Sequence, residues 1–201
     1  VLAHMSGDEN MIDAFKHGED IHSKTASQIF DVDIKDVTSK QRIEAKAINF
    51  GIIYGKTDFG LSQDLNIPVA TAKAYIDSYF NKYPKIKEFM DEAVESATET
   101  GYATTILNRR RYIPEIKASN FIVRNQGKRF AMNAPIQGSA ADIIKVAMVN
   151  VYNKLKENNM KSRLILQVHD ELIVEAVDEE LEMAEKIVRE EMEMHNLWML
   201  N

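Results

Sequence analysis

Two cations and two aromatic rings recur at four-residue intervals in one short segment of the chain. They are Arg42, Lys46, Phe50 and Tyr54. On an α-helix of 3.6 residues per turn, a step of four residues drifts by only about 40°, so the four side chains would share one face. The cations lie toward the helix N-terminus, where the backbone dipole also favours anions. This order fits a nucleoside triphosphate, which carries a polyanion at one end and a flat base at the other.

A second candidate lies between two apolar runs, 164–168 and 172–175, that can pair as a β-hairpin. His169 and Asp170 would then lie at or beside the turn, with Glu171 next to them. Two adjacent carboxylates at an exposed turn suit a hard divalent cation.

Both candidates also have a simpler interpretation. The four-residue pattern fits an ordinary amphipathic helix with buried rings and solvated cations. His169 and Asp170 are residue types that tolerate the positive φ of tight turns, so they can serve as turn formers alone. Taken separately, neither pattern decides between structure and chemistry.

The elements that must position these side chains are mostly helices. Apolar residues at three- and four-residue spacing predict two short helices over 8–30 interrupted at Gly18, a helix from Thr38 or Ser39 to about Gly55, one from Pro68 to Pro84, and one from Lys85 to about Thr100 closed by Gly101. The following stretch predicts a loop with short extended pieces and a helix near 119–132.

The last third of the chain predicts both helix and strand. Asn133 as N-cap and Pro135 in the first turn indicate a helix that reaches about Lys156. The hairpin follows, and then an acidic amphipathic helix over 178–194. The predicted fold class is α+β and mostly helical.

Composition excludes several classes of protein. The hydrophobic fraction of 45% and the charged fraction of 28% are those of an ordinary globular chain. No apolar run approaches the roughly 20 residues of a membrane-spanning helix, and the start lacks a basic segment followed by an apolar one. We expect neither export nor membrane attachment, and the lack of cysteine agrees with a cytoplasmic location.

Charge is distributed unevenly along the chain. The net charge is -6, yet between 106 and 130 seven basic residues accompany a single acid, Glu115. The acidic residues collect instead between 170 and 193. A local basic stretch of this kind can bind a nucleic acid even when the average charge is negative.

Two segments together resemble a known family. Segment 42–55, RIEAKAINFGIIYG, and segment 168–171, VHDE, resemble motifs B and C of family A DNA polymerases, the bacterial DNA polymerase I type. Segment 133–145 resembles the part of that family that contacts the primer-template, and segment 20–26 resembles part of its fingers. The resemblance extends to about residue 190.

The resemblance implies a division into subdomains and a role for each matching residue. Residues 1–7 would be a palm remnant, 8–130 the fingers, and 131–201 a palm portion with part of an antiparallel sheet, the motif C hairpin and a C-terminal helix. The nucleotide would be bound by His22, Arg42, Lys46, Phe50 and Tyr54, the DNA would be contacted by Arg129, Asn133, Gln137 and His169, and Asp170 with Glu171 would bind metal.

The implied reaction is template-directed attack of a primer 3′-hydroxyl on a deoxynucleoside triphosphate. Two Mg²⁺ ions would be expected in the complete enzyme, with Asp170, Glu171 and Lys46 as catalytic residues. The partners would be primer-template DNA and deoxynucleotides, and we expect a monomer.

The chain departs from the family at both ends. In that family the segment preceding Val1-Leu2-Ala3-His4 is motif A, which carries another metal-binding aspartate and a glutamate that excludes ribose. The resemblance therefore implies a fragment that begins just after motif A and lacks the thumb, so we expect it to be inactive alone. Residues 195–201 do not match the Gly-rich, Trp-containing end of the family, and its final strand is expected to be missing or altered.

Two other functions compete with DNA synthesis. A single-subunit RNA polymerase shares the Arg, Lys and Tyr-Gly spacing but resembles the chain less well at Phe50 and at His169-Asp170-Glu171. A non-catalytic DNA-binding fragment would use the basic stretch, tolerate loss of Asp170 and need no Mg²⁺.

Overall fold

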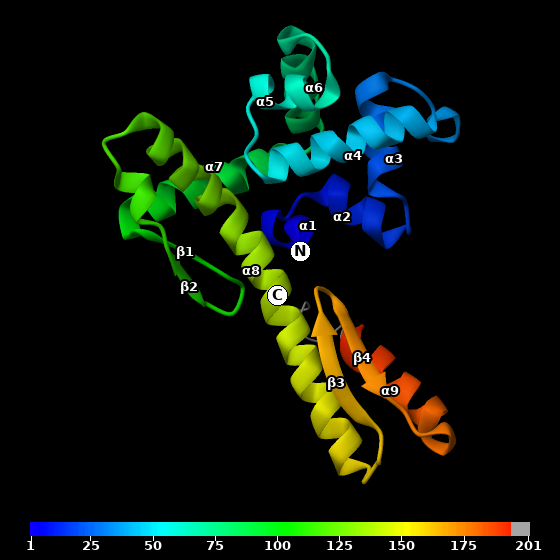
Figure 1. Ribbon diagram of the computed structural model, residues 1–201. Coiled ribbons are helices and arrows are strands. Elements are labelled where there is room, and N and C mark those ends of the chain that lie inside the picture. The colour runs from blue at the N-terminus through cyan, green and yellow to red at the C-terminus, as the bar shows by residue number, and fades with distance from the viewer. Residues whose placement is uncertain (194–201) are drawn as a thin grey trace. The chain divides into compact units, whose positions relative to one another are not determined.

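The structure, a computed structural model, describes residues 1–193 (Figure 1). The expected end of the acidic helix at 194 and the divergent segment from His195 to Asn201 lie outside the described residues. The chain forms two compact units, Val1–Ile136 and Gln137–Asn201. Each unit is described below by itself.

The first unit is almost entirely helical. Its helices are α1 (Leu2–Ser6), α2 (Glu9–Lys16), α3 (Ile21–Phe30), η1 (Ile34–Asp36), α4 (Ser39–Ile53), α5 (Asp58–Leu65), α6 (Val69–Lys82), α7 (Pro84–Thr100) and η2 (Pro114–Lys117), followed by the N-terminal half of α8 (Phe121–Glu157). A two-stranded antiparallel sheet, β1 (Tyr102–Thr104) and β2 (Arg110–Tyr112), lies between α7 and η2 in the chain.

Side-chain caps fix where several of these helices begin. Asp8 and Asp20 accept hydrogen bonds from the third backbone N–H of α2 and α3. Thr38 and Gln41 form a reciprocal capping box at the start of α4, which satisfies two backbone donors. Gly101 ends α7 with a φ of 84°, a conformation that glycine adopts without steric cost.

One side of α4 contributes to the larger hydrophobic core. Ala45 and Ile48 are fully buried and Ile52 nearly so, while α3 and α6 pack nearby (Figure 1). The same core contains the rings of Tyr79 and Tyr83, which are tilted by 54° relative to each other with their centroids 4.9 Å apart. A smaller core joins α7, β1 and η2 to α8 through the buried residues Ala97, Ala103, Ile113, Ile116, Ala131 and Ala134.

The second unit contains the C-terminal half of α8, a hairpin and one further helix. Strands β3 (Arg163–Val168) and β4 (Glu171–Glu175) pair antiparallel, with Val168 opposite Glu171. The short η3 (Asp178–Glu180) leads into α9 (Leu181–Met192). Their core is small and consists of Val151, Leu155, Ala184 and Ile187 with partly buried neighbours.

The predicted fold class is confirmed, because the described residues are mainly helical with two small antiparallel sheets. The helices expected over 8–30, 38–55, 68–84 and 85–100 are all present, as is the hairpin. Two helices, α1 and α5, were not predicted. α5 carries few apolar residues, and only Leu61 of its apolar side chains is fully buried.

The prediction of two helices meeting at Asn133 was wrong, because α8 continues through it with Pro135 inside the helix. Asn133 does not cap a helix; it is buried, and its Nδ2 donates to the carbonyl of Ile53 at 3.5 Å. The neighbours of Asn133 and Pro135 are buried in the helix: Ala131, Ala134 and Ile136. Tertiary packing along this stretch offsets the loss of the hydrogen bond that proline cannot donate.

Among residues 1–193, no helix combines the length and the apolar content that a membrane crossing requires.

Gly127 of α8 provides a test of the packing against η2. A Cβ at this position would lie 2.5 Å from the backbone nitrogen of Ile116, which cannot move without disturbing the smaller core. We expect Gly127→Ala to lower the free energy of unfolding by about 1–3 kcal/mol in urea titrations, despite the higher helix propensity of alanine. Gly60→Ala is the matched control, because its Cβ would be 3.6 Å from the nearest atom. Equal stability of the two variants would contradict the close approach.

Candidate functional site

The stripe of two cations and two rings lies on the exposed side of α4. Arg42 and Lys46 are exposed, and Phe50 and Tyr54 are each 44% exposed. Tyr54 caps the C-terminus of the helix. The interpretation that these rings belong to the core is therefore wrong, and the stripe is open to a ligand.

Arg42 is held by a carboxylate at the start of α3. Its Nε and a terminal nitrogen donate to the two oxygens of Asp20 at 2.7 and 3.1 Å. Ser23 also donates to Asp20, from both its backbone N–H and its hydroxyl. These contacts, those of Arg42 first, hold the pKa of the Asp20 carboxyl well below its usual range.

His22 follows Asp20 by two residues, on the side of α3 that faces α4. The amide Nδ2 of Asn49 is 3.0 Å from Nδ1 of His22. The imidazole ring is 5.9 Å from the ring of Phe50, and Nζ of Lys46 lies 5.9 Å from that same ring. Burial lowers the pKa of His22, and Arg42 and Lys46 lower it further while Asp20 opposes them. Two cations, a neutral imidazole and an aromatic ring thus share one surface.

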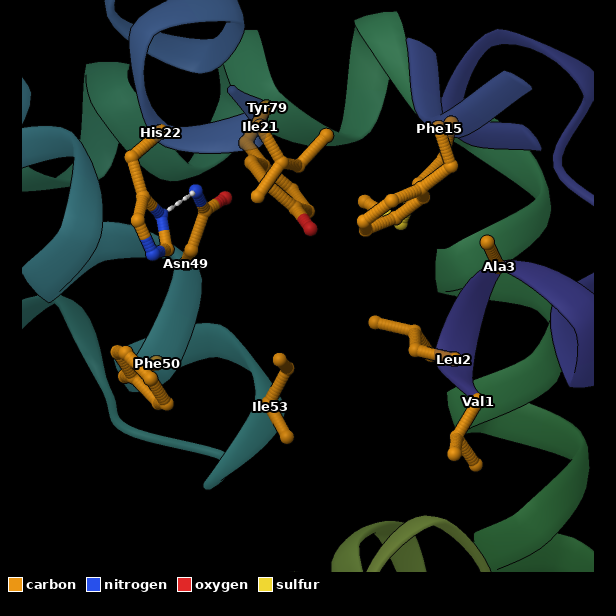
Figure 2. A pocket seen from close by; sticks show the side chains of 11 residues that line it. Val1, Leu2, Ala3, Phe15, Ile21, His22, Asn49, Phe50, Ile53 and Tyr79 are labelled. Atoms are coloured by element: carbon orange, nitrogen blue, oxygen red, sulfur yellow. Dashed lines mark hydrogen bonds between the residues drawn. The ribbon is translucent and has the colours of Figure 1, made fainter. Parts of the chain in front are cut away.

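A cavity adjoins this surface (Figure 2). It measures about 120 Å³ and is lined by His22, Asn49, Phe50 and Ile53 from α3 and α4, with apolar side chains such as Leu2 and Phe15 opposite. Drug-sized ligands occupy roughly 300–1,000 Å³, so the cavity can accept part of a nucleotide but cannot enclose one. The phosphates of such a ligand would remain on the exposed stripe.

The first half of α8 packs against the C-terminal end of α4. Asn133 donates to the Ile53 carbonyl, and Gly55 follows α4 with a φ of 63°. A Cβ on Gly55 would meet Met132 Cε at 2.5 Å and Arg129 Cγ at 3.1 Å; these flexible side chains can shift, so it is the positive φ that favours glycine at this turn. Arg129 and Asn133 are thereby brought to the Tyr54 end of the stripe. Gln137, one helical turn further on, belongs to the second unit.

The second unit carries the hairpin turn. His169 and Asp170 form the two-residue connection between β3 and β4, as predicted, and both are exposed. His169 has a φ of 54°, a left-handed conformation that costs a non-glycine residue on the order of 1 kcal/mol. The side-chain Nε2 of Gln167 donates to the backbone carbonyl of His169 at 2.7 Å. The turn therefore holds Asp170 and Glu171 at an exposed tip.

Asp170 and Glu171 are chemically suited to a magnesium ion. They are adjacent, exposed carboxylates that form no ion pair with other residues in 1–193. Mg²⁺ is commonly bound through one or two carboxylates, with water and substrate phosphates completing the shell. The described residues include no cluster of three or more His, Cys, Asp or Glu that could hold a metal by themselves.

Sequence reasoning missed two residues of this site. Asp20 was recognised as part of a resembling segment but not as the partner of Arg42, and Asn49 was not identified at all. The signal for Asn49 was present, since an amide between Ile48 and Phe50 on the buried side of a helix requires a polar partner. Nothing in the sequence identified that partner as His22.

Comparison with known proteins identifies the family of this chain. The family model for DNA polymerase family A matches residues 1–201, and the chain belongs to that family. It is 54% identical over 193 residues to DNA polymerase I of Caldicellulosiruptor bescii and to DNA polymerase I of Bacillus subtilis. Each alignment covers 96% of this chain but 23% and 22% of those proteins, so the chain spans less than a quarter of the curated relatives it matches.

A solved structure agrees with the sequence comparison. The POL domain of Pol1 from M. smegmatis, in complex with DNA primer-template and dNTP, matches with a TM-score of 0.91 and 46% identity. The match covers 95% of this chain and 34% of that one.

The Asp20–Arg42 pair gives a pH-dependent prediction. Because the folded-state pKa of Asp20 lies below the unfolded value of about 3.9, its stabilisation is complete above that pH and is lost as pH falls below it. Asp20→Asn keeps a helix cap but loses the ion pair. We expect a lower free energy of unfolding at pH 7, in urea titrations, and a smaller difference at pH 3.

The effect should be modest, because both side chains are partly exposed. Asp77→Asn, which removes an exposed pair with Lys73 within α6, is the control and should change stability less. A deficit of Asp20→Asn that is as large at pH 3 as at pH 7 would show that the ion pair is not its cause.

Proposed function

We propose that this chain is part of a template-directed DNA polymerase that adds deoxynucleotides to a primer 3′ end. The observation that carries the proposal is the exposed stripe on α4, with His22 beside it, in a chain of DNA polymerase family A. The M. smegmatis relative was solved with DNA primer-template and dNTP, which supports these as the partners. We also propose that the protein is monomeric and cytoplasmic.

In this proposal α4 binds the incoming nucleotide. Arg42 and Lys46 neutralise the triphosphate, with His22 as a further donor. His22 and Nζ of Lys46 each lie 5.9 Å from the ring of Phe50, so they share one surface. Phe50 packs against the sugar and base, and Tyr54 stacks near the templating base. Lys46 stabilises the negative charge that develops on the leaving pyrophosphate, or donates a proton to it.

The DNA contacts come from α8 and from the hairpin. Arg129 and Asn133 lie at the end of α4 and would contact primer or template there. Gln137 and His169, in the second unit, would contact the DNA as well. We propose that 8–130 form the fingers and that 1–7 and 131–201 belong to the palm.

Asp170 and Glu171 would hold magnesium in the complete enzyme. When bound, the two expected ions would supply Lewis-acid stabilisation of the attacking and leaving oxygens. The chain's own contribution is to present both carboxylates at a turn whose backbone is fixed by Gln167.

The test is single-turnover primer extension by the complete polymerase that carries this chain. We expect Lys46→Ala to reduce the incorporation rate by about 10²–10³-fold, the typical effect of removing one electrostatic contact to a transition state. Lys40→Ala is the matched control, because Lys40 lies on the same helix, is exposed and pairs only weakly with Glu44. Its rate should equal that of the unaltered enzyme.

An unchanged rate in Lys46→Ala would refute the role of Lys46. Asp170→Ala, assayed in parallel, should abolish extension while leaving DNA binding measurable. If the unaltered protein binds DNA without Mg²⁺ and never extends a primer, the chain is instead a DNA-binding module.

Phe50 gives a prediction about sugar selection. A phenyl ring beside the sugar has no hydroxyl to replace the missing 3′-hydroxyl of a dideoxynucleotide, so we expect discrimination against such nucleotides. Phe50→Tyr should relax it, measured as the ratio of kcat/KM for deoxy and dideoxy substrates. An unchanged ratio would argue that Phe50 does not contact the sugar.

A further inference from the structure

Asn49 is a polar side chain on the buried side of α4. It is 5% exposed, and its neighbours Ile48 and Ile52 on the same side are buried in the core. Burying an amide is unfavourable unless its donors and acceptor form hydrogen bonds. Its partners therefore indicate what the amide does in this position.

Both partners of Asn49 lie on α3. Its side chain hydrogen-bonds Thr25 Oγ1 at 3.2 Å, and Thr25 is itself 1% exposed. Its Nδ2 reaches Nδ1 of His22 at 3.0 Å, the contact drawn as a dashed line in Figure 2. Thr25 fixes the amide from one side, so that the amide can hold the imidazole from the other.

Nδ2 of Asn49 is directed at the ring of His22, and this orientation of the amide indicates where the ring proton of His22 lies. An amide N–H can bond only to a ring nitrogen that has a free lone pair, so Nδ1 acts as the acceptor. A neutral imidazole then carries its proton on Nε2, which forms no hydrogen bond within residues 1–193. Burial favours the neutral ring by lowering its pKa; Arg42 and Lys46 act in the same direction, and Asp20 in the opposite one.

We infer that Asn49 is a positioning residue that holds neutral His22 as the Nε2–H tautomer and so presents a hydrogen-bond donor to a phosphate oxygen of the nucleotide. The inference rests on the proposed function. The imidazole lies 5.9 Å from the ring of Phe50, which Lys46 also approaches, so the donor belongs to the surface that carries the cations. Unlike Arg42 and Lys46, the Nε2–H group of a neutral imidazole offers a single donor in one direction and adds no charge.

The tautomer can be measured directly. In protein labelled with ¹⁵N histidine, two-bond ¹⁵N–¹H correlation spectra should show His22 as Nε2–H at neutral pH, with His22→Gln used to assign its signal. Asn49→Asp replaces the donor by an acceptor of the same shape, and should move the proton to Nδ1 and raise the pKa of His22. An Nδ1–H tautomer in the unaltered protein would overturn the inference.

A double-mutant cycle separates positioning from simple structural support. The probe is a deoxynucleoside triphosphate, bound to the complete polymerase with primer-template. We expect Asn49→Asp, at a pH where the ¹⁵N spectra show its His22 to be neutral, to weaken this binding roughly tenfold, because the Nε2–H donor to a charged group is then lost. In a His22→Gln background the same change should have no further effect, because Asn49 would act only through His22. Asn10→Asp, an exposed amide that donates to the Lys82 carbonyl, is the remote control.

The outcomes distinguish this inference from the proposed function. Equal losses from Asn49→Asp with and without His22 would overturn the positioning role. If the unaltered enzyme binds no nucleotide, the proposed function fails, while the tautomer measurement still decides whether Asn49 donates to His22. If Asn49→Asp does not fold, Thr25→Val removes the other partner of the amide at nearly constant volume and takes its place in the cycle. Its loss of affinity should likewise disappear without His22.

Discussion

Burial of one side of α4 is the interaction on which the rest of the first unit depends. Ala45, Ile48 and Ile52 are buried, and the two isoleucines belong to the larger core. Because a helix is rigid, fixing these residues also fixes the direction of the side chains on the opposite face. The exposure of Phe50 and Tyr54 is thus a consequence of core packing: large apolar rings remain in water because their neighbours along the helix occupy the interior.

Polar contacts tie α3 to α4 at the Asp20–Arg42 pair and at Asn49, and these two places differ in environment. The Asp20–Arg42 pair is exposed at the surface, where solvent screens it and salt weakens it. The contact of Asn49 with Thr25 is buried, where a hydrogen bond is stronger and its loss more costly. The exposed ion pair can therefore exchange partners readily, whereas the buried hydrogen bond fixes the geometry of the Asn49 side chain.

Much of the fold follows from local sequence signals, while the site depends on long-range pairing. Apolar periodicity, the Thr38 cap and Gly101 predicted the helices of the first unit, and the left-handed conformation of His169 agrees with the turn chemistry of its residue type. The continuous α8 could not be predicted, because the local signals of Asn133 and Pro135 oppose it and only tertiary burial favours it.

The polar network of the site shows the same limit. Asn49 and His22 are 27 residues apart, and a spacing rule within one helix cannot connect them. Nor could spacing decide whether Phe50 and Tyr54 face the core or water, since both arrangements have the same period. The choice is made by packing of α4 against its neighbours, which only the three-dimensional structure contains.

The bidentate Asp20–Arg42 pair also has a consequence for ligand turnover. An anion that binds the Nε–H edge of Arg42 must displace a carboxylate that already accepts hydrogen bonds from both nitrogens of that edge, whereas the remaining N–H groups of the guanidinium stay available. At this edge, part of the favourable free energy of binding an incoming anion is therefore offset by the loss of the contact with Asp20. When that anion leaves, Asp20 can bind this edge again, because a carboxylate attached to the same chain stays at a high effective concentration beside Arg42.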